Sequence, residues 1–234
     1  MSAGRLTLVP TPVGNLEDIT LRALRVLREA DHVLAEDTRH TGRLLAAHGI
    51  KAPFISFHEH NEERQLPRIL ELLAAGERLA LVSDAGTPGI SDPGFRAVRA
   101  ALAGGYPVEV LPGATAFVPA LVASGLPCER FIFEGYLPRK PGARRRAFEA
   151  LAAEERSVVF YESPQRVAKS LAELAQLLPE RPVALAREIS KLHEGIWRGR
   201  ADELAAALAG RDLKGEFVIV IGGKDARLPA TSLP

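Results

Sequence analysis

Short apolar runs of strand length alternate with longer segments of helical periodicity along most of this chain, and no other feature restricts its fold as strongly. Between the first two runs, residues 18–30 place Ile19, Ala23 and Leu27 on one helical face. Such alternation is typical of an α/β fold, in which helices pack on sheets. In the first half of the chain the predicted strands are residues 6–9, 33–35, 54–57, 79–83 and 108–111.

A helix breaker divides this pattern near its midpoint. Gly125 and Pro127 follow a helix predicted at residues 115–124, and a second α/β series begins after them. We therefore predict two α/β domains, residues 1–124 and residues 125–224, each of ordinary domain size. Residues 225–234 are polar or proline-bearing and lack periodicity, so we expect a disordered tail. In the second half the predicted strands are residues 131–136, 157–161, 183–186, 196–199 and 217–221.

The charge composition limits the kinds of partner that the whole chain could attract. With 30 basic and 29 acidic side chains the formal net charge is +1, so a polyanion would have to bind a local basic patch. The single cysteine, Cys128, excludes an intramolecular disulfide, as is usual in a reducing cytosol. No secretory pattern stands at the N-terminus, and every apolar run is interrupted well before the roughly 20 residues that span a bilayer. We expect a soluble cytoplasmic protein with no membrane partner.

Three loops that directly follow predicted strands are rich in glycine and proline. They are residues 10–15, 83–94 and 111–115, and in open α/β sheets ligands bind at this end of the strands. The loop 83–94 holds three glycines, two prolines and two aspartates, which suits a backbone that approaches a flat polar ligand. The other two loops are equally compatible with rigid turns, and Thr115 with a helix cap. Neither a P-loop nor a G-x-G-x-x-G dinucleotide motif is present in the sequence.

Charged residues gather after the second and third predicted strands. Asp37 and Arg39, next to Glu36, could orient an acceptor hydroxyl or could form an ion cluster that caps the following helix, and the sequence leaves both readings open. Glu59 and His60 follow the third strand. Because no third ligand follows at a suitable spacing, we expect hydrogen bonds to a polar substrate and no metal.

Five cations lie close together in the second half of the chain: Arg139, Lys140, Arg144, Arg145 and Arg146. Uncompensated cations on a loop beside an aromatic-containing strand would bind phosphates, whereas positive charge at a helix N-terminus opposes the helix dipole. We therefore favour polyanion binding over a solvated helix start. Further along, residues 187–194 form a dense run of ionisable groups, which indicates either a site or an internal salt-bridge network.

Nine segments stand in a characteristic order along the chain: TPVGNLEDIT, AEDTRHTGRLL, FHEHNE, SDAGTPGISDPG, LPGATA, FEGYLPRK, FYESPQR, AREISKLHEG and KGEFVIVI. Together they resemble the bacterial 16S ribosomal RNA (cytidine-2′-O)-methyltransferase family, often called methyltransferase I. The resemblance runs from about residue 6 to residue 222. That family is similar to the wider tetrapyrrole-methylase-like (class III) superfamily of S-adenosylmethionine methyltransferases. The Gly-Asp-Pro pattern of the superfamily reads Gly86, Thr87 and Pro88 here, which favours the RNA-methylating branch.

The resemblance implies two α/β domains of the tetrapyrrole-methylase type, with S-adenosylmethionine in the cleft between them. It also implies a homodimer, and 16S ribosomal RNA or the small ribosomal subunit as the partner, with no role for DNA. The implied cofactor residues of the first half are Pro12, Val13, Gly14, Gly86, Thr87, Pro88, Ile90, Ser91, Thr115 and Ala116. Those implied near the adenine are Tyr161, Ala186 and Glu216.

Methylation of a ribose hydroxyl would require its oxygen to be held in line with the methyl group while a nearby group accepts the proton. Candidate bases, which the sequence does not rank, are Asp37, Glu59, His60 and Glu194. Arg39 or Lys191 could stabilise the developing oxyanion. Aromatic residues would read an unstacked cytidine, with the five cations on its phosphates. Two alternatives stay open: a methyltransferase for a tetrapyrrole or other small molecule, and a non-catalytic RNA-binding protein of the same fold.

Overall fold

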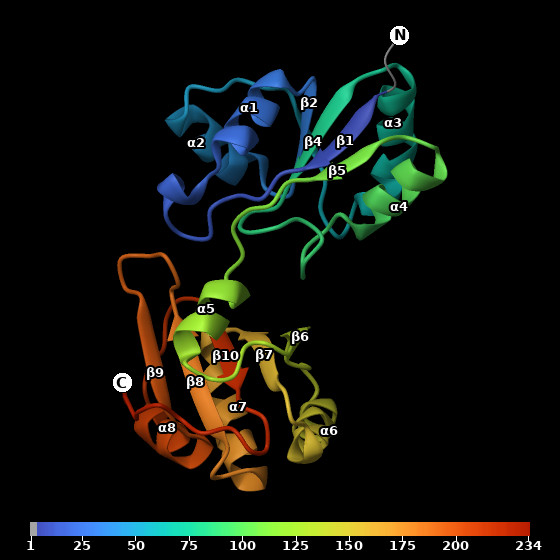
Figure 1. The fold of residues 1–234 in the computed structure, drawn as a ribbon. Coiled ribbons are helices and arrows are strands. Elements are labelled where there is room, and N and C mark those ends of the chain that lie inside the picture. The colour runs from blue at the N-terminus through green and yellow to red at the C-terminus, as the bar shows by residue number, and fades with distance from the viewer. Residues whose placement is uncertain (1–3) are drawn as a thin grey trace. The chain divides into compact units, whose positions relative to one another are not determined.

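Two five-stranded sheets form the framework of the chain, one in each of two units (Figure 1). The structure is a computed structural model, and it describes residues 4–234. Unit 1 comprises Met1–Thr115 and unit 2 comprises Ala116–Pro234. Helices alternate with the strands in both units, so the predicted α/β class is confirmed.

The sheet of unit 1 is parallel throughout, in the strand order β3-β2-β4-β1-β5. Its strands are β1 (Arg5–Leu8), β2 (His32–Ala35), β3 (Phe54–Ser56), β4 (Arg78–Val82) and β5 (Val108–Val110). Its helices are the short 3₁₀ helix η1 (Leu16–Asp18), α1 (Leu21–Glu29), α2 (Thr38–Ala47), α3 (Glu62–Ala74) and α4 (Phe95–Ala103).

Both faces of this sheet are buried, which explains why its strands read as almost continuous apolar runs. Leu6 and Leu8 belong to the core that α3 and α4 cover, whereas the neighbouring Val9 belongs to the core that α1 and α2 cover. Successive side chains of a strand point to opposite faces, so β2 and β4 contribute to both cores: Leu34 and Leu81 to one, Val33 and Ala80 to the other.

The strands β1 and β4 are neighbours in the sheet, but the helices that follow them lie on opposite faces. Helix α1 follows β1 and supplies Ala23 and Leu27 to one core. Helix α4 follows β4 and supplies Ala97 and Ala101 to the other. Open α/β sheets bind ligands where the connections diverge in this way, outside the carboxyl ends of the strands. The arrangement therefore points to the loops after β1 and β4.

Unit 2 has a mixed sheet in the strand order β6-β7-β10-β8-β9, in which only β6 and β7 are parallel. Its strands are β6 (Phe131–Tyr136), β7 (Ser157–Glu162), β8 (Pro182–Arg187), β9 (Gly195–Arg200) and β10 (Phe217–Ile221). Its helices are α5 (Phe117–Ser124), α6 (Pro141–Ala150), the 3₁₀ helix η2 (Leu151–Ala153), α7 (Pro164–Leu177) and α8 (Ala201–Leu208). The main core lies between the sheet and α6, α7 and α8. Among residues 4–234, none of the helices is both long and apolar enough to cross a membrane.

The division between the units falls before α5, not after it as the sequence predicted. Helix α5 is apolar around most of its circumference, and it packs on β7, β8, β9 and β10. Gly125 caps its C-terminus in the left-handed conformation, with φ 72°. The helix breaker that we interpreted as a domain boundary is therefore the end of the first helix of unit 2.

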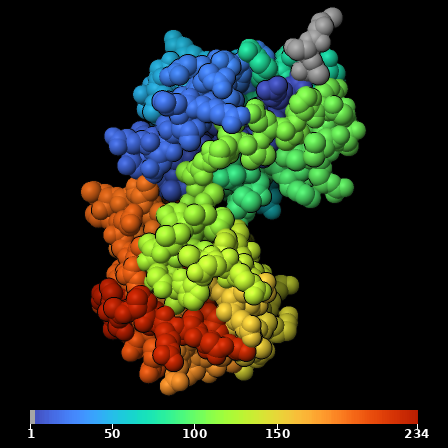
Figure 2. Space-filling model, in the orientation of Figure 1, coloured from blue at the N-terminus to red at the C-terminus, as the bar shows by residue number. Residues whose placement is uncertain are grey.

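Residues 225–234 have little regular structure, but they are attached to unit 2, so the expectation of a disordered tail was wrong. Ser232 and Arg198 of β9 exchange two backbone hydrogen bonds of 2.8 and 2.7 Å. Pro229 packs so closely on Gly125 that a Cβ there would lie 2.8 Å from the proline ring. In Figure 2 the red C-terminal residues lie beside the green residues of α5. These contacts involve single residues, which leave no periodic signal in the sequence.

Candidate functional site

The loops that leave β1 and β4 are joined to each other in unit 1. The backbone N–H of Thr11 donates to Gly86 O, and that of Gly86 donates to Thr11 O, each over 2.9 Å. The buried Thr11 hydroxyl also donates to Ser83 O at 3.1 Å. Gly86 has a φ of 82°, a conformation that favours glycine. The two loops therefore form a single paired element at the carboxyl ends of β1 and β4.

The loop after β5 joins the same element. The Thr87 hydroxyl donates to Ala114 O over 3.0 Å. Gly113 lies against Pro10, where a Cβ would come within 2.6 Å of the proline side chain. This contact explains why the third loop needs a glycine at that position. Three loops from the neighbouring strands β4, β1 and β5 thus meet at the carboxyl ends of these strands.

The predicted cofactor residues of unit 1 lie on these joined loops, namely Pro12, Val13, Gly14, Gly86, Thr87, Pro88, Ile90, Ser91 and Thr115. Among them, Gly86 lies close to Val13, whose Cγ1 would be 3.7 Å from a Cβ on that glycine. Ala116, the last predicted residue of this group, is the first residue of unit 2. Ile90 is exposed. Ser91 has a φ of 62°, which is unusual for a residue other than glycine. Strained backbone of this kind is concentrated at functional sites.

Carboxyl groups lie at the same edge, after β2 and β4. The backbone N–H of Asp37 donates to the Asp84 carboxylate over 3.0 Å. Burial, and then the negative charge of Asp84, raise the pKa of Glu36, and Glu59 adds to this effect. A hydrogen bond from the Asp84 backbone N–H, and then His58, oppose it. Glu36 and Asp84 were not among the predicted catalytic residues. The signal that could have found them is that both directly follow strands, which here are neighbours in the sheet.

Asp37 and Arg39 have a structural role that the sequence had left open. The Asp37 carboxylate caps α2 by accepting the backbone N–H of Arg39 at 2.8 Å and that of His40 at 3.3 Å. It also binds the exposed Arg39 guanidinium at 3.0 Å. This side-chain hydrogen bond with Arg39 is the main cause that lowers the pKa of Asp37 to about 2. A carboxylate with so low a pKa is a poor proton acceptor, which weakens Asp37 as a candidate base.

The segment after β3 is shaped by two buried side chains. The Asn61 amide accepts the backbone N–H of His58 at 2.8 Å and donates to Ser56 O at 3.0 Å. Glu62 is buried and accepts the backbone N–H of Gly94, at the end of loop 83–94, over 3.1 Å. The predicted residues Glu59 and His60 remain exposed. Within the described part of the chain, no three His, Cys, Asp or Glu side chains are grouped as a metal site would require.

The charged run 187–194 of unit 2 forms an internal network. The Lys191 ammonium binds Glu188 at 2.9 Å and Glu216 at 2.8 Å. The predicted base Glu194 accepts the backbone N–H of Ser190 at 2.7 Å. Burial would lower the pKa of Lys191, but the hydrogen bonds that it donates to Glu216 and Glu188 outweigh burial and raise the pKa, so this side chain stays protonated.

The three residues expected near the adenine lie at one edge of the second sheet. Tyr161 of β7 and Ala186 of β8 both pair in register with Val218 of β10, and Glu216 directly precedes β10. Tyr161 is half-buried, Ala186 is buried and Glu216 is exposed. The structure thus brings together the predicted residues of unit 2.

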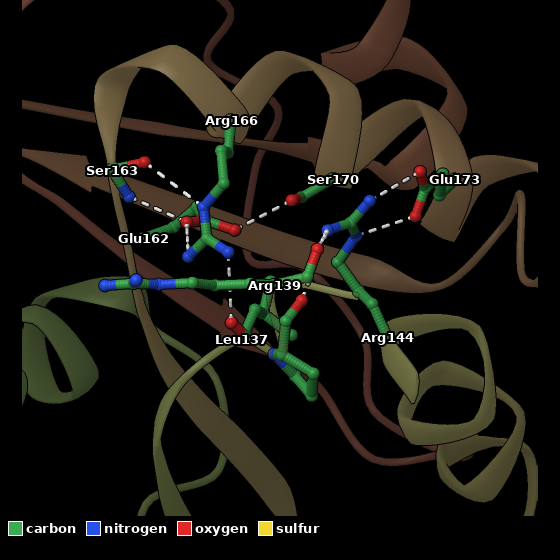
Figure 3. Close-up of polar contacts among 9 residues, drawn as sticks. Leu137, Arg139, Arg144, Glu162, Ser163, Arg166, Ser170 and Glu173 are labelled. Carbon is green, nitrogen blue, oxygen red and sulfur yellow. Dashed lines mark hydrogen bonds and ion pairs between the residues drawn. The ribbon is translucent and has the colours of Figure 1, made fainter. Parts of the chain in front are cut away.

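Arg144 has to be removed from the predicted phosphate-binding cations. It is 2% exposed, and its guanidinium forms two hydrogen bonds of 2.7 Å to the Glu173 carboxylate. It also donates to Pro138 O and Arg139 O (Figure 3). Its partner lies 29 residues away in the sequence, so the basic run alone could not reveal this pairing.

The other four cations stay at the surface. Arg145 binds Glu149, one helical turn further along α6, at 2.8 Å. Arg139, Lys140 and Arg146 are exposed, and none of the three forms an ion pair with any residue in the range 4–234. Arg145 and Arg146 lie in the first turns of α6 and not on a loop as predicted, so only Arg139 and Lys140 precede the helix. The basic segment therefore offers fewer cations than predicted.

Comparison with known proteins gives consistent results. The family model for tetrapyrrole (corrin/porphyrin) methylases matches residues 5–205. The chain is 49% identical over 222 residues to ribosomal RNA small subunit methyltransferase I of Micromonospora olivasterospora, covering 94% of this chain and 71% of that protein. It is 45% identical over 222 residues to the protein of the same name from Thermotoga maritima, covering 95% and 100%.

Solved structures extend this similarity to the fold. Uroporphyrin-III C-methyltransferase of Thermus thermophilus matches with a TM-score of 0.66 and 26% identity, over 94% of each chain. A further structure of that enzyme holds S-adenosylhomocysteine and matches with a TM-score of 0.64 and 24% identity, over 94% of this chain and 97% of the other. The tetrapyrrole-methylase fold is therefore confirmed.

Proposed function

Because this chain belongs to the tetrapyrrole methylase family, and within it to the ribosomal RNA small subunit methyltransferase I proteins, we propose that it is an S-adenosylmethionine-dependent ribosomal RNA methyltransferase. The acceptor that we propose is the ribose 2′-oxygen of a cytidine in the decoding region of 16S ribosomal RNA. The reaction would take place in the cytoplasm, where small subunits are assembled.

The joined loops of unit 1 are the observation that carries this proposal. The Thr11–Gly86 pair and the Thr87–Ala114 hydrogen bond fix three loops at the diverging point of a parallel sheet. Their glycine and proline residues leave backbone N–H and C=O groups near the edge, which suits the amino-acid and ribose parts of S-adenosylmethionine. In unit 2, Tyr161, Ala186 and Glu216 are proposed to contact the adenine.

The bound cofactor would supply an electrophilic methyl group, and the protein has to position the hydroxyl and receive its proton. The candidates Glu59, His60 and Glu194 keep this role, and Glu36 joins them because its raised pKa favours proton uptake. Lys191 and Arg39 remain the proposed cations for the developing oxyanion. Arg139, Lys140, Arg145 and Arg146 are proposed to contact RNA phosphates.

Two further parts of the proposal rest on the family resemblance. The enzyme is proposed to be a homodimer, which light scattering would test directly. Methylation of a tetrapyrrole or another small molecule is the alternative, but relatives 45–49% identical are named for ribosomal RNA. An exposed basic segment at the start of α6 also has no evident use with a small substrate.

The test is transfer of a radiolabelled methyl group from S-adenosylmethionine to small ribosomal subunits isolated from cells that lack this activity. Label should appear at one ribose in the decoding region, recognised by an alkali-resistant linkage in the RNA. Binding of S-adenosylmethionine without any transfer to the subunits would contradict the proposal and favour the small-molecule alternative.

A further inference from the structure

Four aromatic side chains form a continuous row in unit 2, running from α5 across β6 and β7. Phe117 stacks on Phe133 with ring centroids 4.3 Å apart, and Phe133 meets Tyr161 edge to face at 5.0 Å. Tyr136 completes the row with its ring 5.5 Å from Tyr161. We call these four residues the aromatic row. Tyr136, at its end, is 59% exposed.

A bulge in β6 orients the Tyr136 side chain toward the aromatic row. The pairing of β6 with β7 shifts register between Phe133 and Tyr136, and Gly135 between them has a φ of 69°. In a regular strand, residues 133 and 136 would point to opposite faces. The extra residue turns Tyr136 to the face of Phe133, and both rings contact Tyr161. Bulges of this kind redirect a side chain and are frequent beside functional sites.

Two arginines fix the backbone directly after Tyr136 (Figure 3). Arg166 of α7 donates to Leu137 O at 3.3 Å. Arg144 of α6 donates to Pro138 O at 3.2 Å and to Arg139 O at 3.3 Å. Three consecutive carbonyl groups are thus held by side chains from two helices. We call Arg144 and Arg166 the carbonyl-binding arginines.

The carbonyl-binding arginines are themselves fixed by carboxylates. Arg144 is bound in bidentate geometry by Glu173, and Arg166 forms an ion pair with the fully buried Glu162. Glu162 also accepts the Ser170 hydroxyl at 2.8 Å. A buried ion pair is weak evidence for a gain in stability, because the desolvation cost offsets much of the attraction. Fixing the loop in one conformation is a use that the geometry supports directly.

This network leaves a rigid aromatic surface beside exposed cations. Arg139 and Lys140 follow within four residues of Tyr136, are exposed, and form no ion pair within residues 4–234. An aromatic ring with neighbouring cations is the chemistry that binds an unstacked base and its phosphates. A preformed surface also loses less conformational entropy on binding than a mobile loop would.

We propose that Tyr136 is the platform on which one unstacked base of the RNA substrate stacks. Arg139 and Lys140 contact the adjoining phosphates. Arg144 and Arg166 are positioning residues, which act by holding residues 137–139. This inference rests on the proposed function, since it names how that RNA is recognised.

The test compares Tyr136→Ala and Tyr136→Phe in methyl transfer to small subunits that lack the modification. Loss of the ring should raise KM for the subunits about 5- to 150-fold, the usual effect of removing one base–aromatic contact. Phenylalanine should restore KM to within about twofold because it keeps the ring. The Kd for S-adenosylmethionine, measured by calorimetry, should change much less in both variants than KM does in Tyr136→Ala, although the Tyr136 ring contacts Tyr161. Phe95→Ala, which removes an exposed aromatic of unit 1, is the matched control.

The possible results distinguish the stacking role of Tyr136 from the proposed function of the enzyme. If the wild-type enzyme methylates the subunits and Tyr136→Ala does so with the same KM, the stacking role is wrong and the proposed function stands. If Tyr136→Ala instead weakens S-adenosylmethionine binding as much as it raises KM for the subunits, the stacking role is wrong and Tyr136 belongs to the cofactor site. If the wild-type enzyme transfers no methyl group to RNA, the proposed function itself fails.

A double-mutant cycle with Arg144, one of the carbonyl-binding arginines, tests the positioning role separately from any effect on folding. Arg144→Lys keeps the charge but cannot keep the bidentate geometry, so it should raise KM for the subunits several-fold. Combined with Tyr136→Ala, it should add little further, because both changes disrupt one surface. Full additivity of the two effects would overturn the positioning role, whatever the change in Tm.

Discussion

Glu36 is the residue whose ionisation should leave a measurable trace in stability. Burial and the negative charge of Asp84 raise its pKa and Glu59 adds to this, while a hydrogen bond from the Asp84 backbone N–H and the neighbouring His58 oppose it. A raised folded-state pKa stabilises the protein below the unfolded pKa, and this contribution is lost as pH rises through the folded value. Glu36→Gln should therefore increase Tm at pH 7.5, by an amount on the order of 1–4 °C, and change it little at pH 4. Thermal unfolding at both pH values checks this, and an equal shift at both would contradict it.

The roles of some single residues could be predicted from their neighbours in the sequence, and those of others could not. Asp37 and Arg39 could be read as a helix cap because both groups lie within one turn of α2. Arg144 could not be told apart from its neighbours, because its burial depends on Glu173 in another helix. The sequence shows that Glu36 follows a predicted strand. It does not show that Asp84 lies nearby, because that depends on the pairing of β2 with β4.

Loop 83–94 is the element on which the proposed cofactor site depends most, and Glu62 of α3 fixes its end. The buried carboxylate accepts the backbone N–H of Gly94. Glu62→Ala would leave that N–H without its acceptor, at a cost of about 1–3 kcal/mol, and would free the end of the loop. We expect the Kd for S-adenosylmethionine to rise about 5- to 100-fold, with kcat at saturation changed much less. Calorimetric titration and methyl-transfer kinetics measure the two effects.

The neighbouring Glu63 provides a matched control for this loop. It lies on the same turn of α3 and binds Arg96, but its side chain is 78% exposed and does not contact the loop backbone. Glu63→Ala should leave the Kd within about twofold, since exposed ion pairs contribute little. Glu62→Gln keeps an oxygen acceptor and should recover most of the affinity. Equal effects of Glu62→Ala and Glu63→Ala would refute the specific role of the Gly94 contact.

The order of strands and helices along the chain could be predicted from the sequence, but the boundary between the two units could not. Every strand within residues 4–234 overlaps a predicted strand segment, because strands with at least one buried face carry apolar side chains at short, recognisable spacings. The boundary was misplaced because Gly125 ends a helix in the same way whether or not a domain ends there. The packing of α5 on the second sheet depends on tertiary contacts that the local sequence does not encode. The same holds for the contacts of Ser232 and Pro229.

The separate cores of the two units lead to a prediction about cooperative unfolding. Leu81 is buried in unit 1 and Leu171 in unit 2, and truncation of either to alanine should cost about 2–5 kcal/mol. Without ligand, each variant should lower the calorimetric transition of its own unit more than that of the other, because domains with their own cores need not unfold as one.

S-Adenosylhomocysteine should couple these transitions, because the proposed cofactor residues belong to both units: Gly86 and Thr87 in one, Tyr161 and Ala186 in the other. A ligand at 100 times its Kd adds about 2.7 kcal/mol to the state that binds it. If intact residues of both units are required for binding, both transitions should rise together and the effect of Leu81→Ala should reach unit 2. A ligand that raised only one transition would assign the cofactor to that unit alone and would remove the other unit's residues from the site.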